Sequence, residues 1–421
     1  MSSTIRVSSE IAPLRRVLVH RPDFGTSRIS PRRAEELLFD DIVHLPKMQE
    51  EHDVFTAVLR RFLGEGNVLE MEDLFREALG GDDELRREMI ALIADWEELP
   101  RRFLPLLEAM EASELTKTMV TGYYAAEDRI LFDPIPNFIF TRDIAVTVND
   151  HIIISKAAKQ ARYRENFLTR FVMAAHPLFA DVRQGKRLIN LNNVDDFPPS
   201  KQGDRVSIEG GDVMILNEEY LLIGTSERTT AYGVDSLAQR LFAEGVVKNV
   251  VRVPVPAERS FMHLDTIFTQ IDAADFAGYA PIVQRGMSAR VSVLRADGEG
   301  AKYANLMEFL RKEIHPDSRL IAAGQGESPY QEREQWTDAC NLVTLRPGVA
   351  LTYDRNQRTE AAFQEAGYRI MHATDLLKAF RDGIVRPDEI TKTIITLPSS
   401  ELSRGRGGSH CMTCPILRDE L

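Results

Sequence analysis

One local pattern recurs three times along the chain and limits the folds open to it. Each copy has an apolar strand, a turn that carries an arginine, a helix, a glycine and a further strand, and the copies begin at residues 151, 220 and 349. The copies are too degenerate and too widely spaced for a solenoid. We predict ββαβ-like units around a shared centre, where loops from every unit would converge on a site.

Ordinary α/β alternation is the alternative interpretation, and it predicts a doubly wound sheet. No Gly-x-Gly-x-x-Gly sequence opens a helix after a strand, so the dinucleotide-binding version of that sheet lacks its main signal. The stretch 69–124 interrupts the alternation, because its apolar residues follow helical spacing and it contains no strand pattern. We therefore predict a helical subdomain at 69–124, inserted into a catalytic domain formed by residues 1–68 and 125–421.

The composition excludes several classes of protein. The 421 residues are 43% hydrophobic and carry a net charge of −12, which argues against nucleic acid as a partner. No apolar run approaches the ~20 residues that span a bilayer, and the first residues lack the apolar region of a secretory signal. Three cysteines fit a reducing compartment rather than a disulfide framework. We expect a cytoplasmic homo-oligomer that binds a small molecule and neither nucleic acid nor membrane.

The tail holds the first candidate site. Residues 404–408 read Arg-Gly-Arg-Gly-Gly, and Cys411 follows three residues later. Arginines match carboxylates, glycines admit a ligand close to the backbone, and a thiol beside positive charge forms a thiolate more readily. A cysteine nucleophile beside an anion clamp and a solvated basic loop are equally good interpretations of the tail alone. Cys411 and Cys414 form a Cys-x-x-Cys, but no further zinc-spaced ligands accompany it, so we predict no metal.

Three other segments carry polar residues at strand ends or turns. His263 and Asp265 share one face if 261–268 is a strand, and such a pair can do acid–base work or hold a cation. Glu209 precedes two glycines inside a strand pattern, where glycine marks a bulge or a close approach of a ligand. Asn137, Phe140 and Asp143 belong to an apolar run after two prolines. For each segment alone, a structural pair, a turn or a cap is the competing interpretation.

Taken together, these residue types indicate one kind of substrate. Carboxylates suit a cation, arginines suit a carboxylate and a thiolate suits an electrophilic carbon. A molecule with all three features is an α-amino acid that carries a guanidinium group.

The motifs also resemble a known family. They are, in chain order, NFIFTRD, EGGDVM, IGTSERTT, MHLDTIFTQ, REQWTDACN, TYDRN and RGRGG-x-x-CM. The set is similar to that of the arginine deiminases in the guanidine-modifying superfamily, from Val17 to Cys411. The resemblance implies a five-bladed pseudo-symmetric α/β propeller of ββαβ units with an inserted helical subdomain. It also implies hydrolysis of free L-arginine to citrulline and ammonia, without cofactor or metal.

Residue roles follow from the same resemblance. Cys411 would attack the guanidinium carbon, and His263 would protonate the leaving ammonia and later activate water. Asp143, Asp265 and Glu209 would hold the guanidinium nitrogens, and Glu209 would also support His263. The positions that would contact the rest of the substrate are Asn137, Phe140, Arg162, Arg228 and Arg406.

The chain departs from the family pattern beside the nucleophile. The family ending resembles RGRGGPRCMSMP, whereas this chain has Ser409-His410 and Thr413-Cys414. A similar His-Cys pair occurs in the amidinotransferases of the superfamily, which pass the amidino group to an amine. Hydrolysis is favoured by the arginine set and REQWTDACN; transfer, a non-catalytic arginine-binding protein and a thiol oxidoreductase are the alternatives. For His410 we prefer a solvated loop position over a partner of the thiolate.

Overall fold

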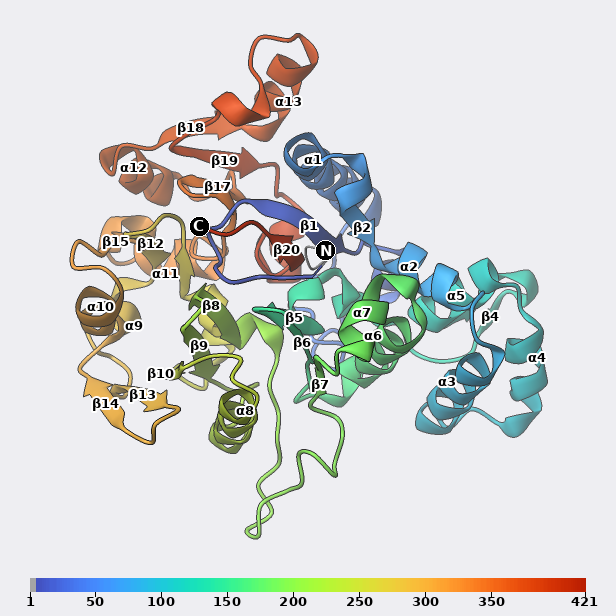
Figure 1. Cartoon of the computed structure of the whole chain (residues 1–421). Coiled ribbons are helices and arrows are strands. Elements are labelled where there is room, and N and C mark those ends of the chain that lie inside the picture. Colours follow the sequence, from blue (N-terminus) through green and yellow to red (C-terminus); the bar gives the residue numbers. More distant parts are fainter. Residues whose placement is uncertain (1–4) are drawn as a thin grey trace.

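A computed structural model describes residues 5–421 as an α/β arrangement of small mixed sheets (Figure 1). Two sheets pair strands in the orders β2-β1-β20 and β5-β6-β7: Val68–Glu70, Leu14–Val19, Cys414–Arg418; Ala145–Val148, His151–Ile154, Leu188–Asn190. The largest has the order β14-β13-β10-β9-β8: Gly300–Tyr303, Val291–Arg295, Asn249–Pro254, Tyr220–Thr225, Val213–Asn217. Two more have the orders β11-β12-β15 and β16-β17-β19-β18: Phe268–Gln270, Asp275–Gly278, Arg319–Ala322; Val343–Arg346, Val349–Tyr353, Thr393–Leu397, Arg369–His372. A hairpin pairs β3 with β4: Tyr123–Tyr124, Arg129–Ile130.

Apart from the β3–β4 hairpin, each of the five sheets contains the same strand unit. An antiparallel pair is followed by a third strand that returns parallel to the second, as in β5-β6-β7 and β8-β9-β10. A parallel return needs a crossover, and helices provide it. The unit formed by β20, β1 and β2 joins the two ends of the chain. The predicted copies that begin at 151 and 220 are therefore confirmed as strand, helix and parallel strand.

The third predicted copy differs in its pairing. Its strand, helix and second strand exist as β17, α12 (Gln357–Glu365) and β18, but β18 does not pair with β17. Instead β19 lies between them, parallel to both. All five residues of β19, Thr-Ile-Ile-Thr-Leu, are buried, which suits the central position.

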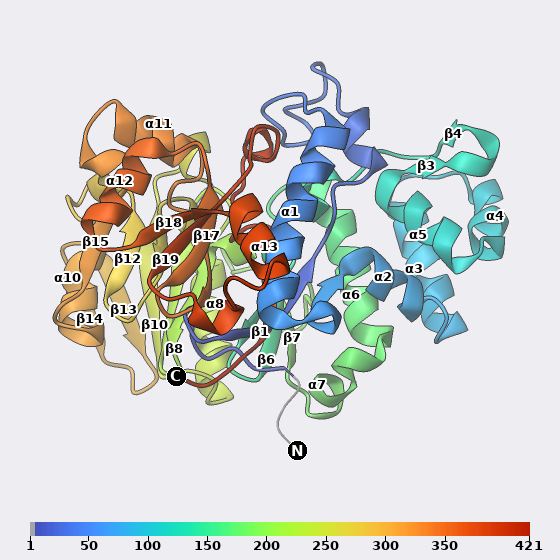
Figure 2. The same cartoon turned by 90° about the horizontal axis from the view of Figure 1, so that it is seen from above.

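Helices cover the outside of these sheets (Figures 1 and 2). The longer ones are α1, α6, α8, α11 and α13: Leu45–Leu63, Tyr163–Ala175, Ala231–Ala243, Tyr330–Trp336, Ala373–Arg381. Short ones are α7, α9 and α10: Ala180–Gln184, Ala280–Val283, Leu306–Phe309. Of the described residues, none forms a helix both long and apolar enough to cross a bilayer.

The segment predicted to be helical contains four helices, α2 to α5: Met71–Ala78, Asp83–Trp96, Leu104–Ala109, Ala112–Thr121. Asp82 starts α3 by accepting hydrogen bonds from the backbone amides of Glu84 and Leu85. In both views these helices lie at one end of the molecule (Figures 1 and 2). They share a hydrophobic cluster with α6 and with β5 and β6, so this end is packed onto the neighbouring sheet. Phe75 of α2 meets Phe171 of α6 edge to face at 5.7 Å.

The prediction that 261–268 is a strand with alternating faces was wrong. Leu264–Thr266 form a 3₁₀ turn, and β11 begins only at Phe268. The turn closes because the amide and the hydroxyl of Thr266 both donate to the carbonyl oxygen of His263. His263 and Asp265 thus lie on a tight turn at a strand end, and each reaches a different partner.

Candidate functional site

The predicted nucleophile lies on the loop between β19 and β20. Cys411 is 4% exposed. Its backbone amide donates to Asn341 Oδ1 at 3.1 Å, and its carbonyl oxygen accepts from the amide of Arg142 at 3.0 Å. At the start of the loop, the carboxylate of Glu51 in α1 accepts hydrogen bonds from the backbone amides of Glu401 and Leu402, each at 2.9 Å. The loop that carries the thiol is thus tied to three other parts of the chain.

The sulfur of Cys411 has two side-chain partners. The thiol donates to Asp265 Oδ2 at 3.4 Å, and Sγ accepts from Asn341 Nδ2 at 3.1 Å. Burial and the carboxylates of Asp265, Asp143 and Asp338 raise the pKa of Cys411 well above its usual value, while Asn341 opposes the shift. The resting sulfur is therefore a thiol, and a bound cation would be needed to favour the thiolate.

His410, next to the thiol, is buried, so the preferred interpretation of it as a solvated residue was wrong. It is 2% exposed and lies between Asp265, 2.8 Å from Nδ1, and Arg142, 2.6 Å from Nε2. Arginine can only donate, so Nε2 accepts and Nδ1–H donates to Asp265. Burial alone would raise the pKa of Asp265, but the hydrogen bond from His410 keeps it below its usual value. Arg142 also donates to Glu10 at 2.9 Å, and this continues the buried network.

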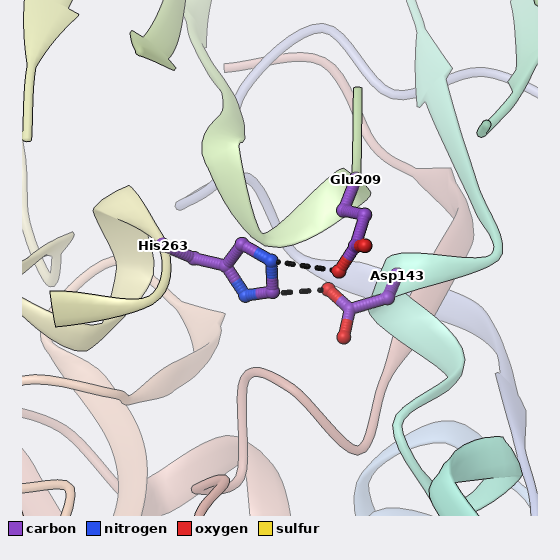
Figure 3. A group of neighbouring side chains, drawn as sticks. All are labelled: Asp143, Glu209 and His263. Carbon is purple, nitrogen blue, oxygen red and sulfur yellow. Dashed lines mark hydrogen bonds and ion pairs between the residues drawn. The ribbon is translucent and has the colours of Figure 1, made fainter. Parts of the chain in front are cut away.

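A second cluster joins His263 to two carboxylates (Figure 3). His263 Nε2 is 3.0 Å from Glu209 Oε2, and Nδ1 is 3.7 Å from Asp143 Oδ1. Burial alone would lower the pKa of His263, but Asp143 and Glu209 raise it to about 9. His263 is therefore an imidazolium at neutral pH and has a proton to give. The two glycines after Glu209 allow this packing, because a Cβ on Gly211 would lie 2.7 Å from His263 Nδ1.

Arg162 occupies the space between the carboxylates. Its Nη1 is 2.5 Å from Asp143 Oδ2 and 3.4 Å from Glu209 Oε2, while Nε and Nη2 bind Glu165. Arg162 is 4% exposed. A guanidinium group that belongs to the protein thus already neutralises these acids.

These residues surround one small cavity of about 20 Å³, room for a single water molecule. Eight of the ten predicted site residues line it: Asn137, Phe140, Asp143, Arg162, Arg228, His263, Arg406 and Cys411. The other two, Glu209 and Asp265, lie behind it in contact with His263 and Cys411. The cavity shares the lining residues Leu38 and Arg228 with an open cleft of about 1390 Å³.

Three of the predicted substrate-binding residues line the cavity and have partners of their own: Asn137, Arg228 and Arg406. Arg406 stacks on the Trp336 ring at 3.4 Å, with a backbone φ of +61°, and its Nε is 3.3 Å from Asp40. Arg228 Nη1 lies 3.5 Å from Glu209. The amide of Asn137 donates to the carbonyl oxygen of Leu37 at 2.7 Å.

The ring of Phe140 packs against the Arg-Gly loop. A Cβ on Gly405 would lie 3.5 Å from Phe140 Cζ, and one on Gly407 would overlap the ring. The absence of a side chain at Gly407 therefore lets the loop pack against this ring.

Asp143, Glu209 and His263 also form a possible cation site, with one ligand atom each within 4.8 Å of one another. Arg162 contacts two of the three and His263 is an imidazolium, so the cluster already holds its own cations. An organic guanidinium that replaces Arg162 suits this environment better than a metal ion.

Some residues of the site were missed in the sequence. Asn341 contacts the nucleophile twice, and Arg142 and Glu10 support His410. Asn341 belongs to REQWTDACN, but a single asparagine followed by apolar residues has no distinctive spacing. Arg142 and Glu10 come from distant parts of the chain and meet only in the folded molecule.

Comparison with solved structures identifies the fold. The N-terminal domain of ArgZ, solved covalently bound to a reaction intermediate, is 14% identical with a TM-score of 0.51, and the match covers 96% of this chain and 98% of that one. SxtG, an amidinotransferase of the saxitoxin pathway from Microseira wollei, is 12% identical with a TM-score of 0.55 over 99% and 98% of the two chains. The α/β fold is therefore that of guanidine-modifying enzymes.

The family follows from the sequence itself. The model of the arginine deiminase family matches residues 35–103 and 97–418. Those two segments include the helical region and all ten predicted site residues, and they confirm the resemblance that the motifs suggested. The chain is therefore a member of the arginine deiminase family.

Proposed function

We propose that this protein hydrolyses free L-arginine to L-citrulline and ammonia through a covalent intermediate on Cys411. One observation carries the proposal: a buried thiol and a histidine–carboxylate cluster line one cavity, and a guanidinium group, that of Arg162, already lies against the carboxylates. The same pocket can therefore present the guanidinium of a substrate to the sulfur.

The reaction would proceed in two halves. Asp143 and Asp265 hold the substrate nitrogens, and the bound cation favours ionisation of the Cys411 thiol, whose proton passes to solvent. The thiolate then bonds to the guanidinium carbon. The C–N bond then breaks, and the departing nitrogen takes the proton of His263 and leaves as ammonia. His263, now neutral, removes a proton from water, which attacks the same carbon. The C–S bond breaks and the new hydroxyl group loses its proton to solvent, so the thiolate returns and neutral citrulline leaves.

Arg162 must move before substrate binds, because a cavity of about 20 Å³ cannot hold an arginine side chain. We propose that its guanidinium turns outward and, with Arg228, Arg406 and Asn137, binds the α-carboxylate. The guanidinium of the substrate then takes the place of the Arg162 guanidinium beside Asp143 and Glu209. The negative charge of these buried carboxylates therefore stays neutralised.

Agmatine, which is arginine without the carboxylate, should be a poor substrate. Without a carboxylate the displaced Arg162 has no partner, and Arg228 and Arg406 keep only their contacts with Glu209 and Asp40. Sites with unpaired polar groups reject such analogues by a factor of roughly 10⁴. The ratio of kcat/KM for arginine and agmatine measures this. Comparable values would contradict the arginine clamp.

The architecture supports two further parts of the proposal. We propose that the five sheets act as the five blades of a propeller around the site. The segment 69–124 would be a helical subdomain inserted into the catalytic domain formed by residues 1–68 and 125–421.

The function is tested by incubating the protein with arginine, with and without glycine as an amine acceptor. Citrulline with equimolar ammonia, unchanged by glycine, is the expected result. Ornithine with a new guanidino compound would instead identify an amidinotransferase, the reaction suggested by His410 and Cys414. If neither set of products forms, the protein only binds arginine.

His410 offers a test of the contact that separates this chain from the family pattern. His410→Asn can still donate to Asp265 and should keep kcat within about tenfold, a ΔΔG‡ of about 1.4 kcal/mol or less. His410→Phe fills the space without a donor to Asp265 and removes one of the two partners of Arg142, which keeps Glu10. Its kcat should therefore fall further, by about a hundredfold. Equal activity of the two variants, both correctly folded, would show that the hydrogen bond to Asp265 is dispensable.

A further inference from the structure

The side-chain amide of Asn341 contacts Cys411 twice, with its nitrogen at the sulfur and its oxygen at the backbone N–H. Its Nδ2 is 3.1 Å from Sγ, and its Oδ1 accepts the amide of Cys411 at 3.1 Å. Nδ2 also donates to the carbonyl oxygen of Asp265 at 3.1 Å. Asn341 is fully buried.

The orientation of this amide follows from its partners. The backbone N–H of Cys411 can only donate and the carbonyl of Asp265 can only accept, so Oδ1 must face the first and Nδ2 the second. The atom presented to Sγ is therefore an N–H donor. A flipped amide would lose both hydrogen bonds and bury two unpaired groups.

The surroundings explain why a donor is needed there. Asp265, Asp143 and Asp338 all destabilise a negative charge on Sγ, whereas Asn341 favours it. Among residues 5–421, Asn341 is the one side chain seen to donate a hydrogen bond to this sulfur. A donor to the charged form favours that form most strongly in a buried site, where water cannot replace it.

The loop that carries Cys411 packs closely against Asn341. A Cβ on Gly408 would lie 2.7 Å from both Oδ1 and the backbone oxygen of Asn341. Ser409 Oγ donates to that same backbone oxygen at 3.3 Å. Asn341 thus contacts the loop at Gly408, Ser409 and Cys411, and the loop has glycine where the amide needs space.

We propose that Asn341 is a catalytic residue that stabilises the Cys411 thiolate by donating a hydrogen bond from Nδ2 and, through Oδ1, fixes the direction of the sulfur. The inference deepens the proposed reaction and rests on it for the role of Cys411. It gives the motif REQWTDACN, which contains Asn341, a role at the reacting sulfur of Cys411.

The test measures the reactivity of Cys411 without any substrate. Cys411 is alkylated with iodoacetamide at several pH values below its thiolate pKa, and its modification is followed by mass spectrometry of the peptide, since Cys340 and Cys414 are also free. Asn341→Asp keeps the size of the side chain and an acceptor for the Cys411 amide but replaces the donor by a carboxylate oxygen. Asn341→Ala removes both contacts.

Alkylation of Asn341→Asp should be at least about tenfold slower than in the parent at each pH, which corresponds to a rise of one unit in the thiolate pKa. Its kcat with arginine should fall by a similar factor and recover as the pH rises, while KM changes little. Asn341→Ala, as a second variant, should also alkylate more slowly. The matched control is Asn249→Ala, which removes another buried amide, hydrogen-bonded to the carbonyl oxygen of Glu219 at the start of β10. It should leave the alkylation rate unchanged.

The outcomes separate this inference from the proposed function. Slower alkylation in the variants sustains the inference even if the parent does not convert arginine. Unchanged alkylation in folded Asn341→Asp and Asn341→Ala overturns it, even if arginine turnover falls, because the residue would then only pack the loop.

Discussion

Cys411→Ala should lose arginine turnover by roughly three orders of magnitude or more, because no other group can form the covalent bond to the guanidinium carbon. Cys411 is the cysteine that lines the cavity in the described part of the chain, 3.4 Å from Asp265. The variant should still bind arginine, since the carboxylates and arginines that hold it are intact. Citrulline formation and arginine binding by calorimetry measure the two effects, and substantial citrulline from the variant would rule out the mechanism.

Cys414→Ser is the matched control for this experiment. Cys414 lies three residues from the nucleophile, but its thiol donates to the carbonyl oxygen of Ala145 at 3.2 Å, and burial raises its pKa to about 12. A serine can make the same hydrogen bond, so most activity should remain. A variant as inactive as Cys411→Ala would favour the thiol oxidoreductase interpretation.

His263→Ala should abolish the release of ammonia, because the leaving nitrogen then has no acid beside it. General acid–base groups contribute about 10²–10⁴-fold, and here one residue serves both halves of the reaction. Arginine should still bind, and mass spectrometry should find little adduct on Cys411 if protonation accompanies the breaking of the C–N bond. An active variant would mean that His263 is only structural.

The charge of His263 also predicts the pH dependence. Its pKa is raised to about 9, so the proton is present below that pH and is lost as the pH rises through about 9. The alkaline fall in kcat/KM, which reports the groups of the free enzyme, should therefore lie near pH 9. Glu209→Gln removes a carboxylate that stabilises the imidazolium, so the fall should move to lower pH. An alkaline limb that does not move in Glu209→Gln would assign it to another group.

The sequence alone was enough to predict much of the fold. Alternation of apolar strands with arginine-bearing turns and helices is a local signal, and it correctly located β9, α8 and β10 and the helices of 71–121. The insertion of β19 between β17 and β18 could not be foreseen, because strand order depends on which buried edges meet in space. The turn at Leu264–Thr266 was missed because a threonine hydroxyl, rather than the apolar pattern, decides the backbone there.

The candidate site divides in the same way. Residue types and family motifs were enough to select Cys411, His263 and the acids as candidates. Polar and charged residues stand out in the sequence when their neighbours are apolar or glycine. Only the tertiary structure showed that His410 is buried against Asp265, that the guanidinium of Arg162 lies against Asp143, and that Asn341 donates a hydrogen bond to the sulfur of Cys411. Each of these depends on contacts between residues far apart in the chain. Burial then turns such contacts into shifts of pKa that no local pattern encodes.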